Sequence, residues 1–227
     1  GTDVVVVSSA ISINNPEVKT AISRGIPILH RSEMLALLMN EKKGIAVAGT
    51  HGKTTTTSMV ALMVERAGID PTVIIGGIVD QFQSNAKTGQ GDYLVAEADE
   101  SDGSLVRLNP HIAIVTNIEA DHMDYYADIN AIKSTFVKFL KKVRPDGLAV
   151  LCVDDRNVKC VAEHYHGRKA TYGLNNGAEI KAINIEFSEL GSTYTVINRG
   201  LEIGRFRLNV PGMHNIYNSL AAIAVGA

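Results

Sequence analysis

Continuous apolar runs alternate with amphipathic stretches along most of the chain, and this order predicts an α/β fold. The longer apolar runs are typical of strands covered on both faces: residues 3–7, 26–29, 45–48, 93–97, 112–116 and 148–153. Shorter strands are expected at residues 73–75 and 170–172. Helical spacing predicts helices over residues 16–24, 32–39, 53–67, 129–143 and 157–164, with a last helix from about residue 214. The chain should therefore form a mostly parallel sheet flanked by helices.

Capping residues mark the ends of several of these helices. Asn15 precedes Pro16, which suits the first position of a helix, and Gly25 follows the expected last turn. Ser32 and Asp128 are the expected N-caps of two later helices, because their side-chain oxygens can accept from first-turn N–H groups. Local chemistry thus supports the boundaries that periodicity suggests.

The pattern changes after residue 180, where apolar and polar residues alternate. This alternation predicts three further strands, at residues 180–187, 193–197 and 203–209. Turns at residues 189–191 and 198–200 would join them into a small antiparallel sheet appended to the main one. The stretch from residue 76 to residue 91 is polar and rich in glycine, and we expect a long loop there.

Composition narrows the class of protein. The 227 residues are 45% hydrophobic and 20% charged, with a formal net charge of −2, so the chain can bury a large core. This charge gives no general attraction for nucleic acid or an anionic membrane. Cys152 and Cys160 follow no metal-ligand spacing, and no apolar run approaches the roughly 18 residues of a membrane span. We expect a soluble, cytoplasmic protein; the sequence indicates no oligomeric state.

One short segment carries the strongest chemical signal. Residues 48–57 read Ala-Gly-Thr-His-Gly-Lys-Thr-Thr-Thr-Thr and join an expected strand to an expected helix. Gly49 and Gly52 allow the backbone to approach an anion, and the helix that follows directs its positive end to the same point. Lys53 would then contact terminal phosphates, while the Thr54 hydroxyl could reach a bound Mg²⁺. The alternative is a strand-to-helix turn with a chance lysine.

Two groups of polar residues follow expected strands at the same sheet edge. Glu97 opens an acidic cluster with Asp99, Glu100 and Asp102, and His122 follows the next strand among further acids. Carboxylate oxygens suit Mg²⁺ beside a nucleotide, and ligands of α/β proteins bind at the carboxyl ends of the strands. A solvated acidic turn and a structural histidine are the alternative interpretations.

The start of the last helix carries a third polar group, His214, Asn215 and Asn218. Helix capping would account for one of these residues. Their side chains could also pair with the edge of a base.

The loop sequence closely resembles the ATP-binding loop of the Mur ligases of bacterial cell-wall synthesis. Three further segments support the resemblance: Glu-Ala-Asp-Glu-Ser-Asp from residue 97, Thr-Asn-Ile-Glu-Ala-Asp-His-Met-Asp from residue 116, and Pro-Gly-Met-His-Asn-Ile-Tyr-Asn from residue 211. The resemblance implies that ATP is bound by Gly49, Thr50, His51, Gly52, Lys53, Thr54 and Thr55, with adenine at His214, Asn215 and Asn218. It also implies that Thr54, Glu97 and His122 hold Mg²⁺ and that Lys53, Glu97 and His122 are catalytic.

The resemblance further implies a domain arrangement and a reaction. Residues 1–43 would be the C-terminal part of a Rossmann-like, UDP-sugar-binding domain, and residues 44–227 the central ATP-binding domain. The reaction would join L-alanine to UDP-N-acetylmuramate through an acyl phosphate. This stretch alone, without a third domain, is expected to bind Mg-ATP weakly and not to ligate. Val137 stands where many members carry a carbamoylated lysine, so we predict no modified lysine.

Three other functions remain open at this point. A recycling ligase that adds a tripeptide to the same sugar shares the loop, although we would expect an aromatic residue in place of Ser101. A P-loop ATPase of another class would need a water-positioning residue that the sequence does not reveal. The third possibility is a nucleotide-binding fragment without turnover.

Overall fold

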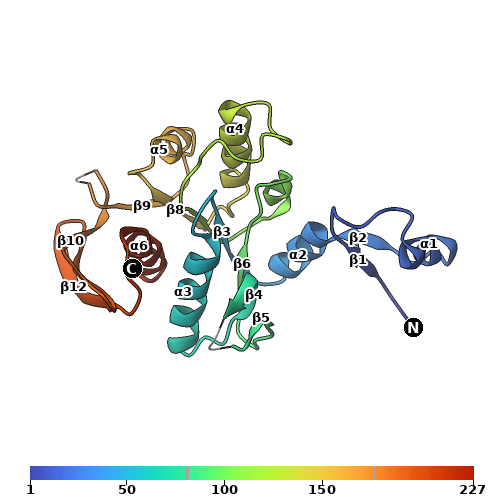
Figure 1. The fold of residues 1–227 in the computed structure, drawn as a ribbon, viewed down its shortest axis with the longest axis horizontal. Helices are drawn as coiled ribbons and strands as arrows, with labels where there is room; N and C mark the ends of the chain where they lie inside the picture. The colour runs from blue at the N-terminus through green and yellow to red at the C-terminus, as the bar shows by residue number, and fades with distance from the viewer. Residues whose placement is uncertain (80–81, 176) are drawn as a thin grey trace.

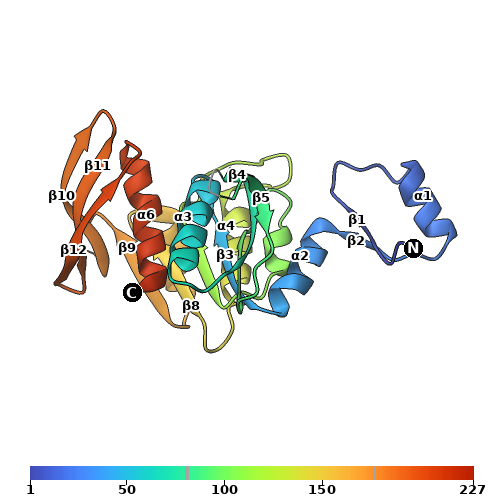
Figure 2. The ribbon, with the colours of Figure 1, turned by 90° about the horizontal axis from the view of Figure 1, so that it is seen from below.

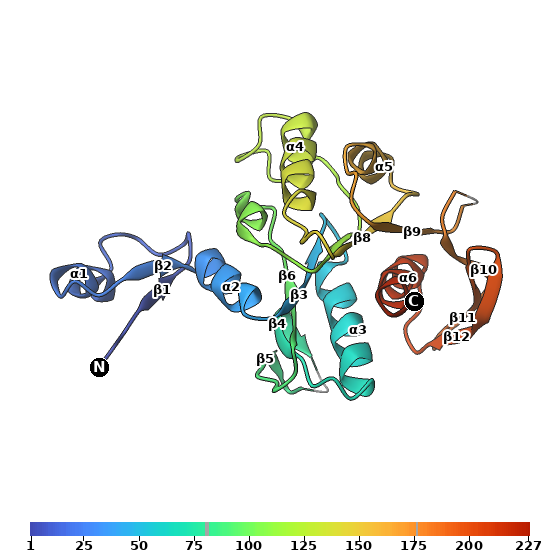
Figure 3. The same ribbon diagram turned by 180° about the vertical axis from the view of Figure 1, so that it is seen from behind.

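The computed structural model describes residues 1–79, 82–175 and 177–227 (Figure 1). Its N-terminal part is a parallel pair of strands, β1 (Val5–Val7) and β2 (Ile28–His30), joined through α1 (Pro16–Ser23). This part projects to one side of the main body (Figure 3). Helix α2 (Arg31–Asn40) connects the two. Asn15 accepts from the N–H groups of Glu17 and Val18, so it caps α1 as predicted.

The main body is built on a mixed sheet that runs in the order β12-β11-β10-β9-β8-β7-β3-β6-β4-β5. Its strands are β3 (Lys43–Ala48), β4 (Thr72–Val79), β5 (Ser84–Lys87), β6 (Tyr93–Glu97), β7 (Ile112–Val115), β8 (Leu148–Cys152), β9 (Lys169–Gly173), β10 (Ile180–Ser188), β11 (Gly191–Asn198) and β12 (Leu201–Leu208). In this spatial order, all neighbouring strands between β10 and β4 pair in parallel. At the two ends of the sheet, β5 pairs antiparallel with β4, β11 pairs antiparallel with β10, and β12 pairs antiparallel with β11.

Helices cover both faces of this sheet. On one face lie α3 (Lys53–Arg66) and α6 (Met213–Gly226), and on the other lie α4 (Ile129–Leu140) and α5 (Arg156–Glu163) (Figure 1). The central strand β3 serves both cores, since Ile45 and Val47 pack with α3 and α6 while Ala46 and Ala48 pack on the opposite side. Two buried faces explain why β3 reads as an unbroken apolar run.

The central prediction for the sheet is confirmed. The strands expected near residues 45–48, 93–97 and 112–116 are β3, β6 and β7, and they lie side by side with β3 in the middle. Their carboxyl ends, where the polar groups of the sequence begin, therefore meet at one edge. Asp128 also caps α4 as predicted, because its side chain accepts from the N–H group of Ala131.

The antiparallel strands after residue 180 are confirmed, but they are not a separate sheet. Because β10 pairs in parallel with β9, strands β10 to β12 continue the main sheet and curve around α6 (Figure 2). The Tyr194 hydroxyl in β11 lies 2.6 Å from the Ser219 hydroxyl in α6, with both residues buried. This contact joins the strand extension to the helix whose first turn carries the predicted adenine residues.

Two local predictions are wrong, and one short element was not predicted. The expected loop over residues 76–91 contains the end of β4 and all of β5, because main-chain pairing forms this hairpin without an apolar pattern; residues 80–81 lie outside the described residues. His30 rather than Ser32 caps α2, since the His30 ring accepts from the N–H group of Ser32. The short 3-10 helix η1 (Ser104–Arg107) had no signal in the pattern.

Side chains of α2 connect the N-terminal part with the main body. Met39 is fully buried in the core on the α4 side. Arg31 forms an ion pair with Asp99, and Glu33 lies 2.9 Å from Arg107. The domain boundary between residues 43 and 44 remains a prediction.

No helix in the described part of the chain is both long and apolar enough to cross a membrane.

Candidate functional site

The loop between β3 and α3 requires glycine at two positions. Gly49 has a φ of 137°, and a Cβ atom there would lie 2.0 Å from the Thr116 hydroxyl oxygen. Gly52 has a φ of 80°, and its Cβ atom would lie 2.5 Å from Oδ1 of Asn218. Side chains are disfavoured at such φ values and have no room at either position. The two glycines therefore let the loop pass close to β7 and α6.

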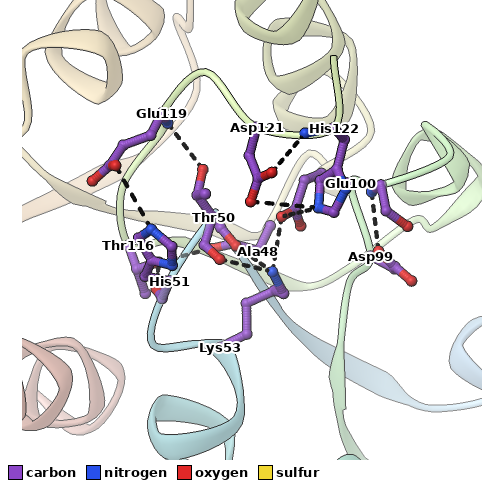
Figure 4. A network of polar contacts seen from close by, with 12 residues as sticks. Ala48, Thr50, His51, Lys53, Asp99, Glu100, Thr116, Glu119, Asp121 and His122 are labelled. Carbon is purple, nitrogen blue, oxygen red and sulfur yellow. Dashed lines mark hydrogen bonds and ion pairs between the residues drawn. The ribbon is translucent and has the colours of Figure 1, made fainter. Parts of the chain in front are cut away.

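The segment after β7 clamps this loop (Figure 4). The His51 N–H group donates to Oδ1 of Asn117 at 2.8 Å, and Nδ2 of Asn117 donates back to the His51 carbonyl at 2.9 Å. Thr116 donates to the same carbonyl at 2.7 Å, and the Glu119 N–H group donates to the Thr50 hydroxyl at 2.9 Å. The His51 amide is therefore engaged by Asn117. The first-turn amides of α3 have no intrahelical acceptors, and such amides can donate to an anion.

Lys53 lies at the centre of the loop. Its ammonium donates to the Gly49 carbonyl at 2.6 Å, to the Thr50 carbonyl at 3.2 Å and to Oε1 of Glu100 at 2.8 Å. Of the acidic cluster that begins at Glu97, it is the Glu100 carboxylate that pairs with the lysine. Figure 4 shows the Glu100 side chain directed at Lys53 from the segment after β6.

His122 lies on the other side of Glu100. Its Nε2 atom is 3.9 Å from Oε1 of Glu100 and 3.9 Å from Oδ2 of Asp121. A φ of 53° places His122 in the left-handed region, where its N–H group donates to the Asp121 side chain at 2.7 Å. The structure thus brings Lys53 and His122 together through an acid between them.

Glu97 lies at the end of β6 and faces β4. Its carboxylate accepts from the Gly76 N–H group at 2.8 Å. Cβ atoms at Gly76 and Gly77 would lie 3.0 Å from Oε2 of Glu97 and 3.3 Å from the Thr54 methyl group. The two glycines therefore lie close to a carboxylate and to a threonine, respectively.

These side chains suit a Mg²⁺ ion bound together with a nucleotide. Such an ion is usually held by one or two carboxylates and by phosphate oxygens and water, so few protein ligands are needed. Among residues 1–79, 82–175 and 177–227, no group of three or more His, Cys, Asp or Glu side chains is arranged to hold a metal by itself. The assignment of Thr54, Glu97 and His122 to Mg²⁺ remains a prediction.

A cavity of about 460 Å³ opens beside the loop. Its lining includes His51, Gly52 and Thr55 from the loop and its helix, and His214 and Asn218 from the start of α6. Two of the three residues predicted to contact adenine therefore face the same space as the phosphate loop. The predicted phosphate and adenine residues thus border one cavity, and the assignment of adenine to it remains a prediction.

The third predicted adenine residue, Asn215, is not part of the cavity lining. Its side-chain amide donates to the Pro211 carbonyl at 2.8 Å, which accounts for it structurally. Asn218 is 6% exposed and accepts from the Thr56 hydroxyl at 3.2 Å, so it also joins α6 to α3.

The far wall of the cavity was not predicted. Asp154, after β8, accepts from the Leu174 N–H group at 2.6 Å and from the Tyr217 hydroxyl at 2.9 Å. Burial, followed by the hydrogen bond and negative charge of Asp154, raises the pKa of Tyr217. The Tyr217 hydroxyl therefore remains a donor. Asp154 and Tyr217 are 63 residues apart, which is why no local motif indicated them.

Cysteine reactivity tests how closely the residues of this cavity wall are packed. Cys152 is 4% exposed and lines the cavity, and burial raises the pKa of its thiol to about 11. At pH 8 only about one molecule in a thousand would carry the thiolate, which is the reactive form. We expect iodoacetamide to label the half-buried Cys160 well before Cys152, as followed by peptide mass spectrometry. Equal labelling rates would contradict the closed packing around Cys152.

Comparison with known proteins gives the same family along the whole chain. The family model described as Mur ligase middle domain matches residues 47–226, and the one described as Mur ligase family, catalytic domain, matches residues 1–43. The UDP-N-acetylmuramate–L-alanine ligase of Syntrophotalea carbinolica is 53% identical over 223 residues, which are 98% of this chain and 49% of that protein. The corresponding ligase of Desulfatibacillum aliphaticivorans is 50% identical and is matched by 100% of this chain and 50% of its own length.

Solved structures agree with this assignment. The UDP-N-acetylmuramate–alanine ligase of Thermotoga maritima has a TM-score of 0.85 at 32% identity, over 98% of this chain and 50% of that chain. The UDP-N-acetylmuramate:L-alanyl-γ-D-glutamyl-meso-diaminopimelate ligase of Neisseria meningitidis also has a TM-score of 0.85, at 28% identity, over 99% of this chain and 73% of that chain. The chain spans about half the length of the curated relatives it matches. It belongs to the Mur ligase family.

Proposed function

We propose that this chain is the nucleotide-binding part of a cytoplasmic, ADP-forming ligase that joins L-alanine to UDP-N-acetylmuramate during synthesis of peptidoglycan precursors. The observation that carries the proposal is that three elements lie at one edge of the sheet, with the cavity beside the glycine loop and the start of α6. The glycine loop with Lys53, the acidic segments after β6 and β7, and the start of α6 all face the same sheet edge. Phosphate, metal and base would each find a suitable partner there.

The proposed reaction has two steps. A carboxylate oxygen of UDP-N-acetylmuramate attacks the terminal phosphorus of ATP, so an acyl phosphate forms as the bond to ADP breaks. The amino group of L-alanine then attacks the carbonyl carbon, and phosphate leaves as the C–N bond forms and the amine loses a proton. The products are the amide, ADP and phosphate.

The side chains of this site would stabilise the first step electrostatically. Charge on the transferring phosphoryl group is best stabilised by donors fixed before the reaction begins. Lys53 is fixed by two loop carbonyls and by Glu100, and α3 directs its positive end to the loop. Bound Mg²⁺ would neutralise further phosphate charge and would be held by Thr54, Glu97 and His122.

The main alternative within the family is the recycling ligase that adds a tripeptide. The fold does not separate the two activities, because the two solved structures above match this chain equally well. The higher identity to alanine-adding relatives favours the alanine reaction. Ser101, where we expect an aromatic residue in the recycling ligases, favours the same choice.

Trapping the intermediate tests the proposal. The natural gene product that contains this chain would be mixed with ATP, Mg²⁺, UDP-N-acetylmuramate and hydroxylamine, and the sugar hydroxamate measured by mass spectrometry. We expect a hydroxamate without any amino acid, and alanine-dependent phosphate release without hydroxylamine. Phosphate release that needs the tripeptide would favour the recycling ligase. ATP hydrolysis without sugar and without hydroxamate would favour another class of ATPase.

A further inference from the structure

Glu100 is a buried acid that contacts Lys53 but is not among the residues proposed to bind phosphate, metal or base. The residue is only 2% exposed. One oxygen, Oε1, accepts from Lys53 at 2.8 Å, while Oε2 is buried without a hydrogen-bond partner among the described residues. A carboxylate removed from water is unfavourable unless it is paired with a positive charge, and it opposes a nearby phosphate. The Oε2 atom, buried and unpaired among the described residues, is therefore expected to destabilise the fold, and a role in stability alone does not explain why Glu100 stands here.

The backbone of Glu100 is held as firmly as its side chain. The Tyr126 hydroxyl donates to the Glu100 carbonyl oxygen at 2.5 Å, and the Gly103 N–H group donates to the same oxygen at 3.0 Å. Tyr126 is 5% exposed, and burial raises its pKa to about 12, so its hydroxyl stays protonated and donates. Two donors from different parts of the chain thus fix the point from which the carboxylate reaches Lys53.

The neighbouring acid points away from the loop. Asp99 forms an ion pair with Arg31 at the start of α2 and accepts from the Ser101 N–H group at 3.0 Å. Asp99 and Glu100 are adjacent, yet Asp99 pairs with an arginine of α2 and Glu100 pairs with Lys53 of the phosphate loop. Of these two neighbouring acids, Glu100 is the one that contacts Lys53.

From this geometry we propose that Glu100 is a positioning residue that holds the Lys53 ammonium and the His122 ring at one point of the site. The inference rests on the proposed function, since it assigns Glu100 a role in that reaction. Oε1 of Glu100 is the atom that both partners approach, at 2.8 Å from Nζ of Lys53 and 3.9 Å from Nε2 of His122. In this role Glu100 acts through the two side chains it orients.

The substitution Glu100→Gln separates positioning from binding. The amide keeps the shape and one acceptor but loses the charge that fixes Lys53, so we expect kcat to fall by about tenfold or more. The KM for ATP should stay the same or fall, because a negative charge near the phosphates is removed. The unfolding temperature is expected to change little, since the side-chain volume is kept. Glu100→Asp keeps the charge but moves it back by one methylene. It should also lower kcat without raising the KM for ATP, but by a smaller factor.

The measurements are made on the natural gene product with Glu189→Gln as a matched control. Glu189 is an exposed acid between β10 and β11, so the same substitution there should retain the kcat and KM of the unsubstituted protein. Lysine ammonium groups held by hydrogen bonds give a ¹⁵Nζ NMR signal, so the Lys53 signal should be present in the unsubstituted protein and be lost or shifted in Glu100→Gln.

The possible outcomes are distinct. A lowered kcat without a raised KM for ATP, together with a changed Lys53 signal, supports the inference. It is overturned if Glu100→Gln keeps kcat within about twofold, or if KM rises while the unfolding temperature falls, which indicates a structural role. Failure of Glu100→Gln to fold leaves Glu100→Asp to decide by the same criteria. If the unsubstituted protein shows no sugar-dependent phosphate release, the proposed function fails and this inference fails with it.

Discussion

Replacing Lys53 with alanine is expected to lower kcat of the natural gene product by at least about a hundredfold. Such a loss corresponds to roughly 3 kcal/mol of transition-state stabilisation, the usual magnitude when one preorganised charged or hydrogen-bonding group is removed. Lys53 supplies its charge from a fixed position, since three acceptors hold its ammonium. Binding of ATP should weaken less than turnover, because the interaction strengthens as charge develops on the phosphoryl group.

Steady-state phosphate release with UDP-N-acetylmuramate and L-alanine measures this effect. Lys138→Ala, on the exposed side of α4, removes the same charge far from the loop and should leave kcat unchanged. Near-normal turnover by Lys53→Ala would mean that the loop is a structural turn, and the assignment of the site would be wrong.

Replacing Gly49 with alanine is expected to lower the free energy of unfolding by about 2–4 kcal/mol and to abolish nucleotide binding. A φ of 137° is strained for any residue with a Cβ atom. The added atom would overlap the Thr116 hydroxyl, which holds the His51 carbonyl, so the clamp on the loop would have to open. Overlap in a close-packed region typically costs a further 1–3 kcal/mol.

Gly25→Ala is the matched control for this change. Gly25 also has a positive φ, 66°, but a Cβ atom there would meet nothing within 4 Å. Its substitution should therefore cost only about 1 kcal/mol of backbone strain. Urea unfolding of both variants separates the two contributions. Equal losses would show that Gly49 is required for its φ angle alone and that the contact with Thr116 carries no weight.

The sequence was sufficient for features that depend on neighbouring residues. Asn15 and Asp128 cap helices through atoms a few residues away, and the residue types of the phosphate loop are set by local backbone geometry. The β3, β6 and β7 strands were predictable because two covered faces leave an unbroken apolar run.

Features that depend on contacts between distant segments could not be predicted. Lys53 and Glu100 are 47 residues apart, and they meet only because β3 and β6 are neighbours in register. The sequence singled out Glu97 as a metal ligand, because it directly follows the apolar run, and it gave no indication of which acid pairs with Lys53. Asp154 and Tyr217 meet in the wall of the cavity for the same kind of reason. Strand β5 was missed because main-chain pairing forms its hairpin with β4, and main-chain pairing has no signature in side-chain pattern.

The most direct test of the account is an NMR titration of this 227-residue chain with a non-hydrolysable ATP analogue and Mg²⁺. The claim is that phosphates bind at the loop while the base enters the cavity beside α6. It predicts concentration-dependent changes in the amide signals of Gly49 to Thr55 and of His214 and Asn218, with smaller changes near Asp154. Signals from the far ends of β10 to β12 should stay constant. An unchanged loop, or changes confined to those distant strands, would contradict the account.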